Sequence, residues 1–485
     1  MADRSAAGLD EATRALLERA MQQLRAQQLG PATTTLQQVL QRAPDQPVAL
    51  QLLGVAAFQS GRGDEAVRLL QRAIAVAPGY LEAHYNLANV FLFQDRLREA
   101  EAGFRRVLAL NARHFDAQLN LSGTLSRMGR LAEASTACRA ALDIDPRNAL
   151  AYHNLGQLYR EQGQHEAAVH ALEQAVKADP GNAQYRVNLR DTYRRTIPGW
   201  HFAMLNDQAR NAAFERAIAK AAPGRRLVLD IGTGSGLLAM MAARAGAERV
   251  VACEANTPLA QVAARIIARN GYADRITVVP KRSTQLAVGQ DLPQPADLLI
   301  SEILDAGLLG EDVIRSFRHA CAALITADAA IIPAGATVYG VLIECPELRR
   351  VNPIKEVSGF DLGEFDIFRN PVAHAQVSLA HEPHRVLSEV FEIARFDFRH
   401  LPNEAPARPL TIPATADGTA QAVAFWFDLR LDDATTLSTA PGGDSKHWRQ
   451  ALTFFDRDRP VRQGETLPLT VGHTDSHFFF GWSDA

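Results

Sequence analysis

A 34-residue period constrains the N-terminal part of this chain more than any other feature of its 485 residues. Proline keeps this step at Pro44, Pro78, Pro146 and Pro180, with Ala112 at the one position of the series that lacks it. Two further columns of small residues keep the same step: Ala32, Ala66, Ala100, Ala134 and Ala168, and Gly61, Gly129 and Gly163. Small residues are needed where two helices touch and where the chain turns between them, so the period predicts a stack of helix pairs.

The repeat length and these columns are those of the tetratricopeptide helix–turn–helix unit. Five units are expected, over 11–44, 45–78, 79–112, 113–146 and 147–180, followed by a capping helix at about 181–197.

One column of this lattice is polar: Asn86, Asn120, Asn154 and Asn188. A carboxamide both donates and accepts hydrogen bonds, so a row of them can bind the main chain of an extended peptide in the repeat groove. The alternative is hydrogen bonding between repeats that only tightens the stack. The row resembles the asparagine ladder of the O-GlcNAc transferase superhelix, which favours a protein or peptide partner.

Composition excludes several classes of function. The formal net charge is −3, so no global basic field recruits nucleic acid or an anionic membrane. The four cysteines lie far apart, without the close pairs of zinc or redox motifs, and no metal site is expected. No run of about 18 apolar residues occurs, and the first residues lack a signal-like apolar core, so we expect a cytoplasmic protein.

After about residue 222, strands alternate with helices, which predicts a doubly wound α/β sheet. Gly232, Gly234 and Gly236 follow the first strand in "VLDIGTGSG", where glycine lets a ligand approach the backbone at a helix N-terminus. A dinucleotide fingerprint would need glycine at position 237, which is Leu237, so a pyrophosphate is disfavoured.

Acids at two strand ends complete this pattern. Asp230 ends the first strand, and Glu254 ends the second, where a carboxylate can accept both hydroxyls of a ribose. The alternative is a glycine turn that binds nothing. The segment resembles class I S-adenosylmethionine-dependent methyltransferases, which implies S-adenosyl-L-methionine as the cofactor.

Two glutamates bracket the loop "SEILDAGLLGE" after the fourth strand, "ADLLIS". Ligands of open α/β sheets bind outside the carboxyl ends of the strands, so Glu302 and Glu311 are expected to flank the pocket. A planar guanidinium can donate to two carboxylates on different edges, which leaves its remaining nitrogen to attack the methyl group. The alternative is a solvated hairpin with acids placed by chance.

This loop resembles the double-glutamate loop of protein arginine methyltransferases, and two more segments agree with that family. "WHFAMLNDQARNAAF" resembles the helix that precedes its catalytic fold, and "SKHWRQALTFF" resembles its Thr-His-Trp loop. The repeats make the chain similar to the symmetric-dimethylating (type II) branch. The implied domains are tetratricopeptide repeats with a capping helix (11–197), a Rossmann-like cofactor domain (198–335) and a β-barrel (336–485) with a dimerisation arm at about 360–386.

The resemblance also implies roles for individual residues. Asp207 and His447 match a pair that assists proton removal, although His447 could instead be purely structural. The cofactor set is Arg210, Asp230, Gly232, Gly234, Gly236, Glu254, Ser283, Thr284 and Glu302. The substrate set adds Met204 and Trp448, for which plain core packing is the alternative, together with Asp305, Val313 and the asparagine row.

Three function classes follow from these observations. The preferred one is methylation of arginine in a protein held by the repeats, with symmetric dimethylation or monomethylation as the product, by a homodimeric enzyme. A methyltransferase for a small cationic molecule and a non-catalytic adaptor are the alternatives. Intact Glu302 and Glu311 argue against the adaptor.

Overall fold

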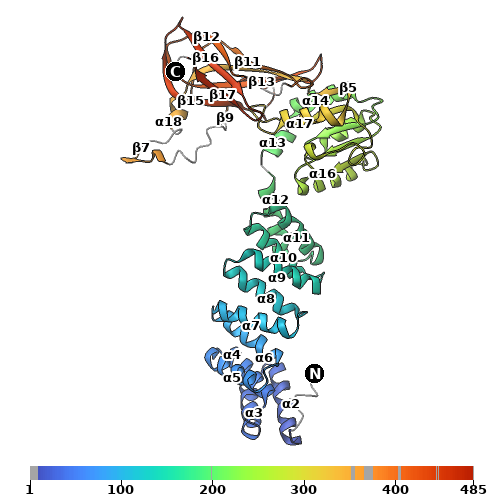
Figure 1. The fold of residues 1–485 in the computed structure, drawn as a ribbon, viewed down its shortest axis with the longest axis vertical. Coiled ribbons are helices and arrows are strands. Elements are labelled where there is room, and N and C mark those ends of the chain that lie inside the picture. Colours follow the sequence, from blue (N-terminus) through green and yellow to red (C-terminus); the bar gives the residue numbers. More distant parts are fainter. Residues whose placement is uncertain are drawn as a thin grey trace. The chain divides into compact units, whose positions relative to one another are not determined.

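A computed structural model describes residues 9–197, 199–350, 356–364, 375–401, 406–443, 445 and 447–483 of the chain. It divides into two compact units, Met1–Thr196 and Ile197–Ala485 (Figure 1). Across the described ranges, no helix combines the length and the apolar character needed to cross a membrane.

The first unit is a stack of helix pairs, as the 34-residue period predicted. The pairs are α2 (Glu11–Arg25) with α3 (Leu29–Arg42), α4 (Pro47–Gln59) with α5 (Gly63–Val76), α6 (Leu81–Phe93) with α7 (Leu97–Leu110), α8 (Phe115–Arg127) with α9 (Leu131–Ile144), and α10 (Ala149–Glu161) with α11 (His165–Ala178). The helix α12 (Ala183–Thr196) follows the last pair and packs on α11. The expected tetratricopeptide solenoid is therefore confirmed.

The turn inside each pair has the same backbone conformation even where glycine is missing. Gly61, Gly129 and Gly163 have φ of 77°, 75° and 71°, and Gln27 and Asp95 adopt 58° and 59° at the equivalent positions. This left-handed conformation disfavours residues other than glycine. The turn is thus imposed by the packing of the two helices, and glycine only makes it easier to form.

A parallel sheet forms the first part of the second unit. Its strands are β1 (Val228–Ile231), β2 (Val250–Cys253), β3 (Ile276–Val279), β4 (Ala296–Ser301) and β5 (Ile325–Ile332), in the order β3-β2-β1-β4-β5. The accompanying helices are α13 (Trp200–Leu205), α14 (Gln208–Ala221), α15 (Leu237–Arg244), α16 (Thr257–Arg269) and α17 (Val313–His319), with the 3₁₀ turn η1 (Ser283–Gln285) and the short π-helix η2 (Ala320–Leu324). The chain reverses its direction of strand addition at β1, where ligands bind in such sheets.

Antiparallel strands make up the rest of the unit. The larger sheet has the order β10 (Arg385–Val386), β6 (Gly335–Glu344), β13 (Gly418–Arg430), β15 (Gln450–Val461) and β9 (Ala375–Val377), with β11 (Phe391–Asp397) on β6 and β14 (Thr436–Ser438) on β13. A three-stranded sheet contains β12 (Arg408–Pro413), β16 (Thr466–His473) and β17 (Phe478–Trp482). Helix α18 (Pro346–Arg350) and the hairpin β7 (Glu356–Val357) and β8 (Phe360–Asp361) follow β6. The curled antiparallel part is the predicted barrel; residues 365–374 of the predicted arm lie outside the described residues.

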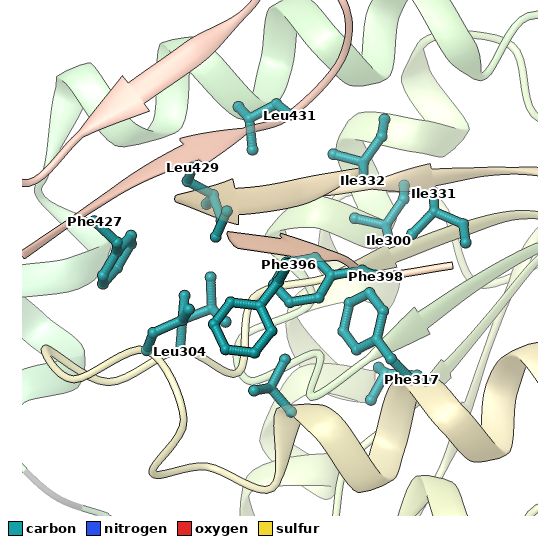
Figure 2. Close-up of a cluster of buried hydrophobic side chains, with 14 of the residues drawn as sticks. Ile300, Leu304, Phe317, Ile331, Ile332, Phe396, Phe398, Phe427, Leu429 and Leu431 are labelled. Carbon is teal, nitrogen blue, oxygen red and sulfur yellow. The ribbon is translucent and has the colours of Figure 1, made fainter. Parts of the chain in front are cut away.

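One apolar core joins the parallel sheet to the barrel strands. Figure 2 shows Ile300 of β4, Ile332 of β5, Phe396 of β11 and Leu429 of β13 in one cluster, in which Phe317 of α17 packs against Phe398 with ring centroids 4.8 Å apart. Leu304, in the loop after β4, belongs to the same core. The loop with the two glutamates therefore starts from a rigid base.

Candidate active site

The ends of three adjacent strands bring the predicted acids to one edge of the parallel sheet. Ile231 at the end of β1 pairs with Cys253 of β2 on one side and with Ser301 of β4 on the other. Glu254 and Glu302 are the residues that directly follow these strands. Carboxylates 48 positions apart in sequence thus flank the glycine loop that follows β1.

The glycine loop has the backbone conformation that its sequence predicted. Gly232, Gly234 and Gly236 have φ of 72°, 55° and 81°. A Cβ on Gly232 would lie 2.3 Å from Cγ2 of Ile303, whereas one on Gly234 would meet nothing closer than 4.0 Å. Gly232 is therefore required by packing against the strand β4 connection, and Gly234 leaves open space at the sheet edge.

Glu254 is held by backbone amides rather than by a side-chain cation. Its Oε2 accepts a hydrogen bond from the Gly234 amide at 3.1 Å, and its Oε1 accepts one from the Asn256 amide at 2.9 Å. Each carboxylate oxygen has a second lone pair, which can accept a hydroxyl group. The carboxylate is thus oriented toward the loop and can still bind a ligand.

Asp230 is fully buried beneath this loop. Its Oδ2 accepts a hydrogen bond from the Thr233 hydroxyl at 2.6 Å, while Oδ1 has no partner among the described residues. Burial raises the pKa of Asp230 to about 7, against the lowering effect of the Thr233 bond. Burying a carboxyl with an unsatisfied oxygen is costly, so this position requires an acid for some purpose other than packing.

A buried ion pair connects Arg210 of α14 to Glu302 after β4. A guanidinium nitrogen of Arg210 donates to Glu302 Oε2, and both side chains are almost completely enclosed. Burial raises the pKa of Glu302, and Arg210 opposes that rise. Arg210 Nε is enclosed and has no hydrogen-bond partner in the described part of the chain.

The segment that was expected to form one helix before the catalytic fold forms two. The helices α13 and α14 are separated at Asn206 and Asp207, because Asp207 caps α14: its Oδ1 accepts a hydrogen bond from the Arg210 amide at 3.1 Å. Its Oδ2 accepts bonds from the Ser445 hydroxyl at 2.8 Å and from the backbone amide of His447 at 3.0 Å. Asp207 therefore joins the helix to the predicted Thr-His-Trp-like loop.

The ring of His447 is neutral under ordinary conditions. Burial and the nearby Arg210 lower its pKa to about 4. The ring centroid lies 5.9 Å from that of Trp200 and 5.4 Å from that of Trp448. A neutral imidazole has a lone pair that can accept a proton, although a pKa of about 4 makes it a weak base at pH 7.

The second glutamate of the loop differs from the first. Burial, followed by repulsion from Glu302, raises the pKa of Glu311 to about 7. Within the described residues its carboxylate makes no hydrogen bond. Glu302 is thus already paired with a guanidinium, whereas Glu311 is available to a ligand.

Trp448 holds the loop from the barrel side. Its Nε1 donates to the carbonyl of Leu304 at 2.8 Å, and its ring packs edge-on against Phe427 at 5.6 Å. The indole is almost fully buried. The structure therefore gives Trp448 a supporting contact with the loop that neither interpretation of the sequence included.

The remaining predicted residues lie at different depths. Met204 is buried in α13, and Val313 is fully buried at the start of α17. The Ser283 hydroxyl donates to that of Ser316 at 3.1 Å, so it faces α17, while Thr284 is partly exposed. Asp305 Oδ1 accepts a hydrogen bond from the Gly310 amide at 3.0 Å inside the loop itself.

In the first unit, the asparagine row divides into two kinds. Asn120 donates to the Tyr85 hydroxyl at 3.2 Å and to Asn89 at 2.9 Å, and the Asn188 amide lies 2.7 Å from Nε2 of His153. These bonds cross from one repeat to the preceding one, as the alternative interpretation expected. Asn86 and Asn154 make no such bond within the described residues, and both are partly exposed.

The enclosed polar atoms without partners fit a cofactor of the predicted kind. Arg210 Nε and Asp230 Oδ1 have no partner in the part of the chain that the structure describes, Glu254 keeps free lone pairs, and Gly234 leaves room beside it. A ligand with a carboxylate, an amine and ribose hydroxyls supplies a complementary group to each. No group of three or more metal-binding side chains is found in the described ranges.

Comparison with known proteins decides the family. Residues 334–478 match the arginine methyltransferase oligomerization subdomain, and residues 214–336 match the ribosomal protein L11 methyltransferase model. Tetratricopeptide repeat models match 23–75, 57–122, 114–180 and 153–226. The arginine N(omega)-methyltransferase of Streptomyces achromogenes subsp. streptozoticus is 44% identical over 285 residues, covering 58% of this chain and 78% of that protein. The chain belongs to the arginine methyltransferase family.

Other relatives of this arginine methyltransferase are longer. The protein arginine N-methyltransferase 7 of Drosophila yakuba is 35% identical over 322 residues. The matched region covers 57% of this chain but only 46% of that relative. A solved Trypanosoma brucei PRMT1 enzyme–prozyme complex with AdoHcy has a TM-score of 0.49 at 24% identity, over 56% of this chain and 87% of that one. The prediction that this chain is an enzyme and uses S-adenosyl-L-methionine as its cofactor is therefore confirmed.

Sequence reasoning missed two contacts of this arginine methyltransferase. The cap formed by Asp207 had a readable signal, since Asp directly before the first residue of a helix is a frequent N-cap. The bond from Trp448 to Leu304 had none, because the two residues are 144 positions apart.

Proposed function

We propose that this enzyme methylates a terminal guanidinium nitrogen of arginine in a protein substrate recruited by the tetratricopeptide unit. The observation that carries the proposal is the pair Glu302 and Glu311 on one loop at the sheet edge, where Glu302 already binds the guanidinium of Arg210. A loop that stabilises one buried guanidinium has the negative charge and the hydrogen-bond acceptors that a second one needs. Glu311 supplies the further carboxylate.

Each predicted side chain has a task in this proposal. Arg210 pairs with the carboxylate of the cofactor, Glu254 binds its ribose hydroxyls, and the glycine loop lies against it. Bound S-adenosyl-L-methionine supplies an electrophilic methyl group on a sulfonium. Glu302 and Glu311 draw positive charge toward the two guanidinium nitrogens they hold, which leaves the third more nucleophilic.

Removal of the proton released by methyl transfer falls to His447. Its ring is neutral at pH 7 because burial and Arg210 lower its pKa to about 4. Asp207 fixes the backbone of that residue through the hydrogen bond to its amide at 3.0 Å. Met204, Trp448 and Val313 are proposed to shape the apolar surroundings of the arginine slot.

The proposed product is symmetric dimethylarginine or monomethylarginine. Support comes from relatives named protein arginine N-methyltransferase 7 and, in Mus musculus, protein arginine N-methyltransferase 9, which is 34% identical over 287 residues. The chain covers only 34% of the mouse relative, so the proposal concerns the catalytic unit that they share.

A second candidate substrate is arginine as a small molecule. The printed name of the Streptomyces relative is arginine N(omega)-methyltransferase, without reference to protein, and this relative is 44% identical. In that case the tetratricopeptide unit acts as a scaffold or binds a partner other than the substrate.

One assay separates these candidates. The full-length enzyme is incubated with radiolabelled S-adenosyl-L-methionine and, in separate reactions, an arginine–glycine peptide, a lysate and free L-arginine. Label in the peptide or in lysate proteins supports the first candidate, and label in free arginine alone supports the second. Glu302→Gln is the control for catalysis. Loss of dimethylamine when the methylated peptide is fragmented in a mass spectrometer is typical of asymmetric dimethylarginine and would contradict the proposed product.

We also propose the three-domain division at 11–197, 198–335 and 336–485, a cytoplasmic location and a homodimer formed through the arm. Four free cysteines are consistent with a reducing compartment. Support for the dimer comes from the hairpin of β7 and β8, where Val357 is 48% and Phe360 71% exposed. Light scattering is expected to give twice the mass of one chain, and Phe360→Asp is expected to shift it toward the monomer. A wild-type monomer at micromolar concentration would contradict the dimer.

A further inference from the structure

The loop from Glu302 to Asp312 is fixed unevenly along its length. As far as Leu309 it is anchored by the bond from Trp448 to the Leu304 carbonyl and by the full burial of Leu308 and Leu309 in the core. Glu302 itself is anchored by Arg210. Glu311 lies at the other end, directly after the exposed Gly310, and among the described residues no hydrogen bond holds its carboxylate. Its position therefore depends on the backbone of its neighbours.

Asp305 closes the loop just before Glu311. Its backbone carbonyl accepts from the Leu308 amide at 2.9 Å, and its Oδ1 accepts from the Gly310 amide at 3.0 Å. Leu308 has a φ of 74°, a conformation that costs energy for a leucine and persists only when surrounding contacts impose it. The Gly310 amide lies outside any helix or strand, and the side chain of Asp305 supplies the hydrogen-bond acceptor that a helix or sheet would otherwise provide.

The fit between Asp305 and Gly310 is close. A Cβ on Gly310 would lie 2.3 Å from Oδ2 of Asp305 and 2.7 Å from its Cγ. Position 310 does not need glycine for a left-handed backbone, because its φ is not positive. The side chain of Asp305, rather than backbone strain, is what excludes a larger residue at this position.

The charge of Asp305 acts on the same glutamate. After burial and the charge of Glu302, the charge of Asp305 is the next cause of the raised pKa of Glu311, followed by Glu254. Asp305 therefore influences both the position of Glu311 and its readiness to take up a proton.

From this geometry we propose that Asp305 is a positioning residue, whose carboxylate holds the Gly310 amide and so directs Glu311 at the substrate guanidinium, a role that rests on the proposed function. Asp305 itself need not touch the substrate. The family resemblance placed Asp305 in the substrate set, whereas the hydrogen bond within the loop supports an indirect action through the backbone.

Two substitutions at Asp305 separate its hydrogen bond from its charge. Asp305→Asn keeps an acceptor for the Gly310 amide and removes the charge, whereas Asp305→Ala removes both. Asp305→Ala is expected to lower kcat/KM about 100-fold, since small misplacements of binding groups have effects of that order. Asp305→Asn is expected to stay within about threefold of wild type at pH 8.5, where Glu311 is ionised in both proteins. In both variants the acid limb of the kcat/KM profile moves to lower pH.

Gly310→Ala provides an independent test of the contact. The new methyl group collides with the Asp305 carboxylate, so this variant is expected to lose about as much activity as Asp305→Ala. The double variant Asp305→Ala/Gly310→Ala is expected to be no worse than either single one, because the collision disappears with the carboxylate. Additive losses would overturn the proposal. Asp312→Asn is the matched control on the same loop: Asp312 is paired at 3.7 Å with Arg282 and is not among the causes of the raised pKa of Glu311.

A structural readout keeps the test separate from the identity of the substrate. Hydrogen exchange at the amides of Leu308 to Glu311 is expected to speed up in Asp305→Ala and to remain as in wild type in Asp305→Asn. Calorimetry with S-adenosylhomocysteine is expected to show unchanged affinity, which confirms that the variants fold. Equal exchange in Asp305→Ala and wild type would overturn the positioning role. Failure of wild type to methylate any arginine acceptor would instead defeat the proposed function, and the exchange result would still decide the contact.

Discussion

Arg210 and Glu302 form a buried ion pair across 92 positions of sequence, with side chains that are only 3% and 4% exposed. The pair joins the helix α14 to the edge of the parallel sheet, at the start of the loop with both glutamates. Arg210 Nε remains unpaired within the described residues. One arginine thus stabilises a glutamate proposed to bind substrate and still has a donor for an anionic cofactor group.

Removing Arg210 should destabilise the protein strongly. Arg210→Met leaves Glu302 buried without its partner, a change that typically costs about 3–5 kcal/mol. This loss is measured by urea denaturation, from the transition in which the second unit unfolds. The double variant Arg210→Met/Glu302→Gln is expected to recover part of it, because the uncompensated charge is gone. A loss below about 1 kcal/mol for the single variant would show that the pair contributes little.

The pH dependence of kcat/KM should report Glu311. Its raised pKa of about 7 means that the carboxyl takes up a proton as pH falls through that value, so it no longer attracts a guanidinium. Activity is therefore expected to fall below pH 7. His447, with a pKa lowered to about 4, does not titrate in this range. The acid limb should consequently persist in His447→Gln at lower activity, and its disappearance there would assign the limb to the histidine.

Trp448 should affect both stability and catalysis through one hydrogen bond. Trp448→Phe keeps most of the ring but leaves the buried Leu304 carbonyl without its donor at 2.8 Å, which costs about 1–3 kcal/mol. The loop with the glutamates loses its barrel-side support, so kcat/KM should fall as well. Trp482→Phe removes a similar bond, from Nε1 to the Arg457 carbonyl at 3.3 Å, away from the loop. Equal effects of the two variants on kcat/KM would contradict a special role for Trp448.

The asparagine row should separate into stabilising and ligand-binding positions. Asn120→Ala loses its bonds to Tyr85 and Asn89 of the preceding repeat and is expected to lower the free energy of unfolding by about 1 kcal/mol. Asn86→Ala is expected to change stability less but to weaken binding of an arginine–glycine peptide. Denaturant unfolding and fluorescence anisotropy measure the two effects. Peptide binding that is unaffected by Asn86→Ala would count against the groove as the recruiting surface.

Local rules explain why so much of the fold could be predicted. A helix pair of 34 residues repeats its small residues because each pair makes the same close contact, and that regularity is visible in any single chain. Gly232, Gly234 and Gly236 reveal a loop conformation because few other residues tolerate it. Glu254 and Glu302 were placed at one sheet edge because parallel strands end together.

By itself, the sequence determined the repeat solenoid, the parallel sheet and the two glutamates of the loop, since each depends on neighbours in sequence or on a fixed period. Only the tertiary structure decided the partners of the acids at the site: Glu302 pairs with Arg210, Asp207 with the backbone amide of His447, and Asp305 with the backbone amide of Gly310. The physical reason is that charge pairing and burial depend on distances between residues that the chain brings together only on folding. Of the two glutamates on one loop, Glu302 therefore has a charged partner while Glu311 has none within the described residues, and their pKa values are raised for partly different reasons.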